Sequence, residues 1–363
     1  MSIHLKKEHF IGEPSYIIFQ SDDGLYYAVN QKTKDVLAKS ADPTTVIQQA
    51  IDALANGGKI LIRQGIYEIN APITLKSYIS LIGEGWNTIL KPTEGMNEPI
   101  LTTPDNVDNH HILIADLAIS GTGVSNLGSS NEGIVLFRPW LNKIWHVMVR
   151  ELGGVGIHLR ESPHEEIHLN WVTDSYIDWV NGHGIHISSV SDVVVARNEI
   201  GRCGQPEWPT RTITDSCGVF LYNSSVVKIF ENHIHQSGQA NVQVEESEQV
   251  LIENNRLEQS SKHNIGSGAM HRSIIQGNKM RNCNMGGATD GSHISLYNCT
   301  YNFIVGNKML DDQPSPTSVY ALQEVGETSD YNVVILNDVR ENPQGIVLIG
   351  TNSIAQNNPG VDL

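Results

Sequence analysis

An asparagine recurs through the second half of the chain, each time followed two residues later by an apolar residue. The successive spacings are 34, 23, 23, 29 and 30 residues. Repeats of this length indicate a solenoid, because a unit of a few short strands buries its apolar face only by stacking on the next unit. We expect the asparagines to stack as a structural ladder, with Ser175 taking the position one coil earlier. They are Asn198, Asn232, Asn255, Asn278, Asn307 and Asn337.

A second apolar strand recurs later in each unit, and its inward positions are Ile157, Ile185, Val219, Val242 and Ile265. Side chains alternate across a strand, so the residues next to these inward positions face solvent. Stacked coils turn those outward residues into rows along the solenoid. One row contains His158, His186, Phe220 and Gln243, and the other contains Arg160, Ser188, Tyr222, Glu245, Gly268 and Tyr297.

The first 58 residues differ from the repeats that follow. Residues 1–41 read as a small antiparallel β unit, with a hairpin turn at 21–24. Residues 43–55 read as a helix with Asp42 as N-cap and an apolar face formed by Val46, Ile47, Ala50, Ile51 and Leu54. We expect this helix to cover the open apolar end of the coils. The sequence therefore predicts an all-β parallel β-helix with its capping helix over 42–352, and a loose tail over 353–363.

Bulk properties exclude some classes of partner. The formal charge of −16 over 363 residues disfavours nucleic acid, whose phosphates need a basic surface. The sequence has no apolar run long enough to span a bilayer, so no membrane partner is expected. The start, Ser2 to Glu8, lacks the apolar region of an export signal. Localisation stays open, and extracellular or virion-associated action is compatible with the sequence.

The four cysteines show no Cys-x-x-Cys spacing, which argues against a structural zinc site. Buried free thiols are the favoured interpretation. Disulfides between Cys203 and Cys217, and between Cys283 and Cys299, are the alternative.

The segment from Asp42 to Pro92 resembles the start of pectate-lyase-superfamily proteins, which are right-handed parallel β-helices. The resemblance rests on residues 42–53, on Gly57-Gly58-Lys59-Ile60, Gly65-Ile66-Tyr67 and Ile82-Gly83-Glu84-Gly85, and on Thr88-Ile89-Leu90. It implies a right-handed coil and a polysaccharide substrate. Such proteins include polysaccharide lyases, glycoside hydrolases, uronate epimerases and phage tailspike depolymerases, and a tailspike-like protein would be a homotrimer. The sequence has no catalytic signature that matches one family closely, so no family's active-site residues are transferred.

Titratable and aromatic residues concentrate on the outward face of the middle coils, between the 204–216 loop and the strand at 242–245. Converging polar groups of this kind mark binding sites. We expect Arg160 or Lys262 to bind a carboxylate, while His186 and Tyr222 exchange protons. The candidate catalytic residues are His186, Tyr222, Arg160, Lys262 and His263, and the candidate substrate-binding residues are His158, Trp208, Phe220, Gln243, Glu245 and Asp215.

Two reaction types compete for this face. A glycosidase needs two carboxyl groups about 5–9.5 Å apart, and the expected register leaves Asp215, Glu245 and Asp290 further apart than that. Uronate lyases and C5 epimerases need a cation, a base and an acid, which the face supplies. The sequence therefore favours uronate chemistry, with glycoside hydrolysis, a tailspike-type depolymerase and a non-catalytic sugar-binding or structural β-helix as alternatives. No cofactor is required and no metal ligands are assigned, because His183 and His186 alone do not make a site. Calcium would be compatible.

Overall fold

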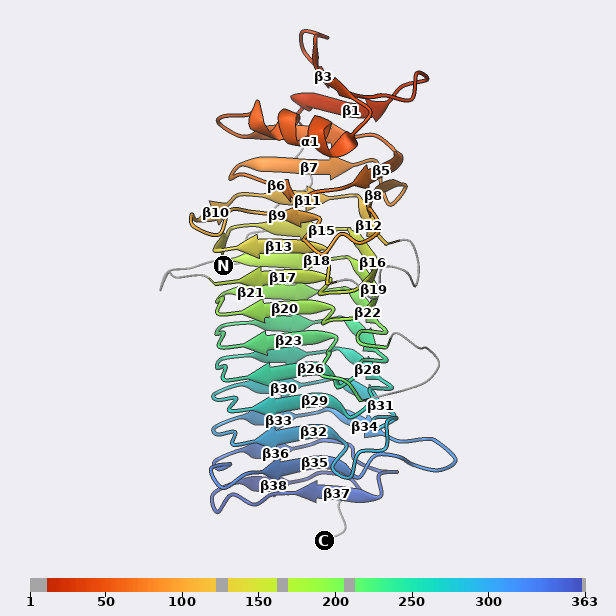
Figure 1. Cartoon of the computed structure of the whole chain (residues 1–363). Helices are drawn as coiled ribbons and strands as arrows, with labels where there is room; N and C mark the ends of the chain where they lie inside the picture. Colours follow the sequence, from red (N-terminus) through yellow and green to blue (C-terminus); the bar gives the residue numbers. More distant parts are fainter. Residues whose placement is uncertain (1–11, 122–129, 162–168, 206–212, 361–363) are drawn as a thin grey trace.

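Three long sheets wrap around one apolar core in the computed structural model, which describes residues 12–121, 130–161, 169–205 and 213–360 (Figure 1). Most coils contribute one strand to each sheet, and equivalent strands of successive coils pair in parallel. We call the three sheets A, B and C. A two-stranded sheet of β10 (Asn109–His110) and β14 (Pro139–Trp140) adds a further pairing. No helix in the described ranges is both long and apolar enough to cross a bilayer.

Sheet A contains the N-terminal unit as well as one strand of each coil. Its order is β3 (Val36–Ser40), β2 (Tyr26–Asn30), β1 (Tyr16–Gln20), β4 (Gly58–Ile62), β7 (Ile79–Gly83), β11 (Leu113–Ala115), β15 (Lys143–Trp145), β18 (Asn170–Thr173), β21 (Val193–Ala196), β24 (Lys228–Phe230), β27 (Leu251–Glu253), β30 (Ile274–Gln276), β33 (Phe303–Val305), β36 (Val333–Ile335) and β38 (Ile354–Gln356).

Sheets B and C form the other two walls of the solenoid. Sheet B runs through β5 (Gly65–Ile69), β8 (Thr88–Pro92), β12 (Ala118–Ser120), β16 (Met148–Leu152), β19 (Tyr176–Val180), β22 (Glu199–Gly201), β25 (His233–His235), β28 (Arg256–Glu258), β31 (Lys279–Arg281) and β34 (Lys308–Leu310). Sheet C runs through β6 (Ile73–Thr74), β9 (Leu101–Thr102), β13 (Ile134–Phe137), β17 (Ile157–Arg160), β20 (Ile185–Ser188), β23 (Val219–Tyr222), β26 (Ala240–Glu245), β29 (His263–Gly268), β32 (Ser292–Tyr297), β35 (Tyr320–Val325) and β37 (Gln344–Val347).

The predicted asparagine ladder is present at the bend before sheet B. Each side-chain amide donates to the side-chain oxygen of the next asparagine at 2.9–3.0 Å, from Asn198 through Asn337. The same oxygen also accepts the preceding coil's backbone N–H, as between Asn232 and Asn255 at 3.0 Å. All six side chains are buried. The ladder therefore satisfies polar groups that the bend would otherwise bury without partners, and the predicted register is confirmed.

Helix α1 (Pro43–Asp52) lies beside β7 at the N-terminal end of the coils (Figure 1). The Asp42 carboxylate accepts the Thr44 backbone N–H at 3.0 Å, which is an N-cap bond. Val46, Ile47, Ala50 and Ile51 are buried. The helix contacts the N-terminal strands on one side and β5 and β6 on the other. The apolar residues of the helix are thus shielded from water by the strands that it contacts.

The first and last strands of the described residues both pair within sheet A. Strand β1 pairs antiparallel with β2 and parallel with β4, so the N-terminal unit continues the sheet. In the C-terminal segment, β38 pairs with β36, and Asn358 accepts from Asn337 at 3.1 Å. The asparagine ladder therefore extends by one residue, Asn358, into the segment that the sequence predicts as a loose tail. The domain boundaries at 41/42 and 352/353 stay predictions.

All four cysteines are free and buried. The expectation of buried free thiols is therefore confirmed, and the alternative disulfides are absent.

Candidate functional site

Strand pairing in sheet C reproduces the two outward rows that the sequence predicts. His158, His186, Phe220 and Gln243 follow one another across β17, β20, β23 and β26. The second row runs from Arg160 to Tyr297, and Glu245 lies next to Gly268. The rows hold because the bends keep the strands in register even where the loops between them differ in length.

The first row begins as a stack of aromatic rings. The His158 and His186 rings lie parallel, with centroids 4.2 Å apart, and His183 stacks on Phe220 at 4.5 Å. Burial lowers the pKa of His186 to about 2 and that of His183 to about 4, and the nearby imidazoles add to both shifts. His186 and His183 are therefore neutral near pH 7, and this part of the row is a ring-lined wall.

Two polar contacts hold the His158 ring in this stack. Its Nδ1 lies 3.0 Å from Glu132 Oε1, and its Nε2 lies 3.2 Å from Ser188 Oγ. Arg160, next along the strand, forms an ion pair with Glu161 at 3.1 Å and lies over the Phe137 ring.

Further along sheet C, two outward glycines in β29 open a groove, which we call the sheet C groove. It has a volume of about 190 Å³. A Cβ on Gly266 would lie 2.0 Å from Gln243 Oε1, and one on Gly268 would lie 2.1 Å from Glu245 Oε2. The neighbouring side chains therefore lean into the space that the glycines leave free. Gln239, Gln243, Glu245, Lys262, His263, Gly266, Ser267, Gly268, Asp290, Ser295, Tyr297 and Val325 line the groove.

One end of the sheet C groove carries a cation and an imidazole. Lys262 Nζ lies 3.0 Å from Asp290 Oδ2. His263 is buried, and its Nδ1 accepts the Ser292 backbone N–H at 3.2 Å. Burial, followed by the charge of Lys262, lowers the pKa of His263 to about 4. His263 is thus neutral near pH 7, with its proton on Nε2.

The other end of the groove carries a carboxyl group and one phenol, and a second phenol lies beside it. Burial raises the pKa of Glu245, and Gln243 Nε2 donates to its Oε1 at 2.5 Å. Tyr222 and Tyr297 belong to the same row as Glu245, on either side of it, and both are exposed. Glu245 is therefore a carboxyl group that can exchange protons beside solvent-facing phenols.

The carboxyl groups at the two ends of the groove are far apart. Glu245 is level with Gly268, the last residue of β29, whereas Asp290 lies in the turn before β32 and pairs with Lys262, just before the first residue of β29. The length of β29 between them is roughly 17 Å. This separation exceeds the spacing of a glycosidase pair, as the predicted register implied.

The structure divides the predicted site residues into groups. Gln243, Glu245, Lys262 and His263 share the groove, and Tyr222 lies beside it. His158, His186 and Phe220 form the ring stack. Arg160 pairs with Glu161, Asp215 is exposed, and Trp208 lies outside the described residues. The sequence-based site omitted Gly266, Gly268, Asp290 and Tyr297, although a glycine in an outward row was a visible signal.

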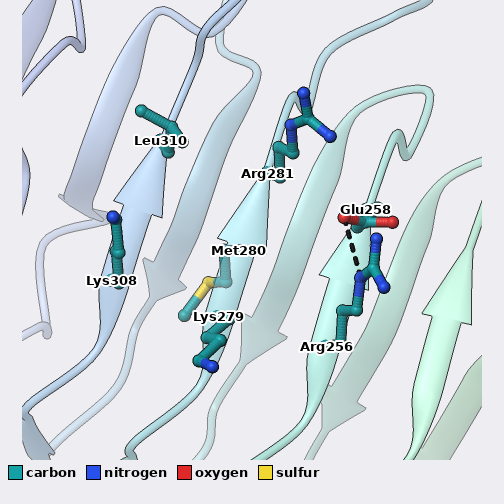
Figure 2. A pocket seen from close by; sticks show the side chains of 7 residues that line it. All are labelled: Arg256, Glu258, Lys279, Met280, Arg281, Lys308 and Leu310. Carbon is teal, nitrogen blue, oxygen red and sulfur yellow. Dashed lines mark ion pairs between the residues drawn. The ribbon is translucent and has the colours of Figure 1, made fainter.

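A second groove lies on sheet B, and we call it the sheet B groove (Figure 2). Its volume is about 200 Å³. Four cations line it in a protein of net charge −16, and Arg256 pairs with Glu258 at 2.9 Å. The lining residues are Arg256, Glu258, Lys279, Met280, Arg281, Lys308 and Leu310.

Comparison with known proteins supports the class of fold. Residues 217–359 match the family model described as "Right handed beta helix region". No sequence among the curated proteins matches the chain significantly. With the parallel sheets described above, these observations define the chain as a right-handed parallel β-helix, as its resemblance to the pectate-lyase superfamily implied.

Several solved structures share this fold with the chain. The A-module of the Azotobacter vinelandii mannuronan C-5 epimerase AlgE4 is similar over 87% of this chain and 96% of its own length, at 18% identity and a TM-score of 0.66. The Dettilon tailspike protein is similar over 84% of this chain and 65% of its own length, at 13% identity and a TM-score of 0.68. The DFA-IIIase of Arthrobacter chlorophenolicus is similar over 82% of this chain and 91% of its own length, at 13% identity and a TM-score of 0.56.

Proposed function

We propose that the chain is an enzyme that modifies a uronate-containing polysaccharide, by β-elimination or by C5 epimerisation, in the sheet C groove. The observation that carries this proposal is the gap above Gly266 and Gly268, which is flanked by Glu245, Tyr297 and Lys262. The similar solved structures include a mannuronan epimerase and a tailspike, which supports a polysaccharide substrate.

The chemistry at C5 of a uronate needs a base and a second proton-transferring group. Glu245 supplies the base, because its raised pKa places it closer to neutral pH than an ordinary carboxylate. Tyr297 lies two strands away across Gly268, which is about 10 Å between backbones. A sugar ring in this gap would have the carboxylate on one side and the phenol on the other.

A cation must neutralise a substrate carboxylate for binding or for catalysis. Lys262 is partly exposed at the far end of the groove, and its ammonium has three donors, of which Asp290 uses one. Lys262 immediately precedes β29, and Glu245 on β26 is level with Gly268 at the other end of β29, so Lys262 would bind the carboxylate of a neighbouring sugar unit. The polysaccharide would then run along β29.

The roles assigned from sequence to His186 and Tyr222 stay predictions. Tyr222 is next to Glu245 in its row and remains a candidate for proton transfer. His186 has a pKa of about 2 because it is buried, so it is a weak base. Its contribution in this proposal is to the shape of the ring-lined wall.

The test is a screen of alginate, pectate, neutral glycans and capsular polysaccharides. A lyase gives an unsaturated product that absorbs in the ultraviolet, and an epimerase changes the uronate composition without cleavage. We expect Glu245→Gln to lower kcat at least about 100-fold, the usual contribution of a general base. Tyr297→Phe should lower it as well, while Tyr301→Phe, on an exposed turn, should not.

Other outcomes of the screen would overturn parts of the proposal. New reducing ends without an unsaturated product would show a hydrolase. Full activity of Glu245→Gln would place the chemistry elsewhere. Calcium dependence stays a prediction, which a chelator in the assay tests. A homotrimer also stays a prediction, which sedimentation tests.

A non-catalytic sugar-binding β-helix is the second candidate, and the sheet B groove favours it. Lys279 and Lys308 are level with each other on paired strands and exposed, so they could bind successive acidic groups. This function predicts polyuronate binding without turnover. The double variant Lys279→Ala, Lys308→Ala should then lose that binding, while Glu245→Gln should keep it.

A further inference from the structure

Three side chains on sheet B bring metal-ligand atoms together away from the sheet C groove. Glu199 lies on β22, and His233 and His235 lie on the paired strand β25. Glu199 Oε2 is 3.0 Å from His233 Nδ1, and Glu199 Oε1 is 3.0 Å from His235 Nε2. One ligand atom from each residue lies within 4.8 Å of the others. A tetrahedral zinc site with bonds of 2.0–2.2 Å has ligand separations of about 3.4 Å, so small rotations would suffice.

Each histidine is held through its other ring nitrogen. His233 Nε2 lies 3.3 Å from Glu258 Oε2, and Arg256 Nε pairs with the other carboxylate oxygen, Glu258 Oε1, at 2.9 Å (Figure 2). His235 Nδ1 lies 3.3 Å from Gln236 Oε1. An outer acceptor of this kind takes the ring proton and leaves the inner nitrogen's lone pair for a metal. Both inner nitrogens face Glu199.

A glycine makes room for this arrangement. Gly201 is level with His235 on the neighbouring strand. A Cβ on Gly201 would lie 2.4 Å from the His235 ring. The imidazole therefore lies over the glycine and toward Glu199, where any larger residue would push it away. The three ligands are partly exposed, so an ion has access from solvent.

We propose that Glu199, His233 and His235 bind one divalent transition-metal ion of the zinc class. Two imidazoles and one carboxylate suit zinc, and a fourth position stays open to water. The ion would join β22 to β25 across two successive coils. The proposal is independent of the chemistry in the sheet C groove, and it departs from the sequence-based expectation that assigned no metal ligands.

The test uses chelator-treated protein without a histidine tag. Calorimetric titration with zinc chloride should show one ion per chain. Cobalt chloride should give the visible absorption of a tetrahedral site. We expect His235→Ala and Glu199→Gln each to weaken zinc binding at least about 100-fold. Glu258→Gln should weaken it about 10–100-fold, as losses of outer partners do.

The control is His271→Ala, which removes a partly buried imidazole whose Nδ1 contacts Thr300. It should bind zinc as tightly as the unmodified protein. Circular dichroism of each variant shows whether the coils remain folded, and Glu199→Gln keeps the size of the side chain. Absence of zinc binding at millimolar concentration, or binding by Glu199→Gln and His235→Ala as tight as that of the unmodified protein, would overturn the proposal.

Discussion

At the scale of single residues, the groove depends on two residues that have no side chain. Gly266 and Gly268 interrupt rows that elsewhere carry rings, carboxylates and amides. Gln243 and Glu245 occupy part of the freed space with flexible side-chain ends. The floor of the groove is thus backbone, and its walls are movable polar groups. In the proposed function, Gly268 would control both substrate access and the position of Glu245.

We predict that Gly268→Ala lowers turnover of the substrate at least about 10-fold while the fold is retained. The new methyl group would meet the end of the Glu245 side chain at 2.1 Å and displace it. Because that end is flexible and can move aside, the loss of stability should stay near about 1 kcal/mol, the usual size for a point substitution. Kinetics and denaturant unfolding measure the two effects. Ser191→Ala, on a partly exposed turn, is the control, and undiminished turnover by Gly268→Ala would remove the groove from the mechanism.

At the scale of elements, the asparagine ladder links successive coils through side chains, in addition to the backbone bonds of the parallel sheets. Asn255 donates to Asn278 Oδ1 and to Ile229 O, and it accepts from Asn232. We predict that Asn255→Ala lowers the free energy of unfolding by about 2–4 kcal/mol, because several buried groups lose their partners. Asn358→Ala, at the partly exposed end of the ladder, should cost less. If urea unfolding shows the same loss of stability for Asn255→Ala and Asn358→Ala, burial of the ladder does not add to its stabilising effect.

The N-terminal helix provides a second prediction at this scale. Ile51 is fully buried between α1 and the coils. Ile51→Ala should cost about 2–5 kcal/mol, the range for deleting a large apolar side chain from a core. Asp52→Ala, on the exposed side of the same helix, is the matched control. If both variants unfold at the same denaturant concentration, the helix does not cover the core as its apolar face predicts.

The sequence predicts most of the fold because the fold repeats. The shared position of the asparagines determined the register, and alternation along a strand then placed His158, Tyr222 and Glu245 in their rows. The groove was not predictable in the same way. It is an empty space, which arises from missing side chains on one strand and from the rotamers of Gln243 on another. Tyr297 was in a predicted row, but that it faces Glu245 across the groove became visible only in the structure.

At the scale of the whole molecule, the solenoid separates surfaces of different chemistry. Sheet C carries neutral rings and the candidate groove, whereas sheet B carries the cationic groove and the histidine–glutamate cluster. The core that joins them is continuous from Ile18 to Val339. Ionisation on one wall therefore acts on the stability of all the coils together.

Buried histidines predict how this stability depends on pH. Burial lowers the pKa of His263 and of His293 to about 4. In the unfolded chain each would titrate near 6.5, so the unfolded state binds more protons between pH 6.5 and 4. Stability is then complete above pH 6.5 and falls as the pH drops to 4, by up to about 3 kcal/mol for each histidine. The Glu199 pKa of about 2 adds a separate loss below pH 4.5.

Urea unfolding at about pH 7.5, 6 and 4.5 measures this dependence, because these values span the titration range of histidine. The variant His293→Asn tests its origin. His293 receives a hydrogen bond from Asn264 at 2.8 Å, and Asn264 receives one from Asn241 in the same way. An asparagine there would extend the row with a group that does not titrate. Its unfolding should depend less steeply on pH than that of the unmodified protein. A slope that is the same in both proteins would show that the buried imidazole of His293 does not control acid stability.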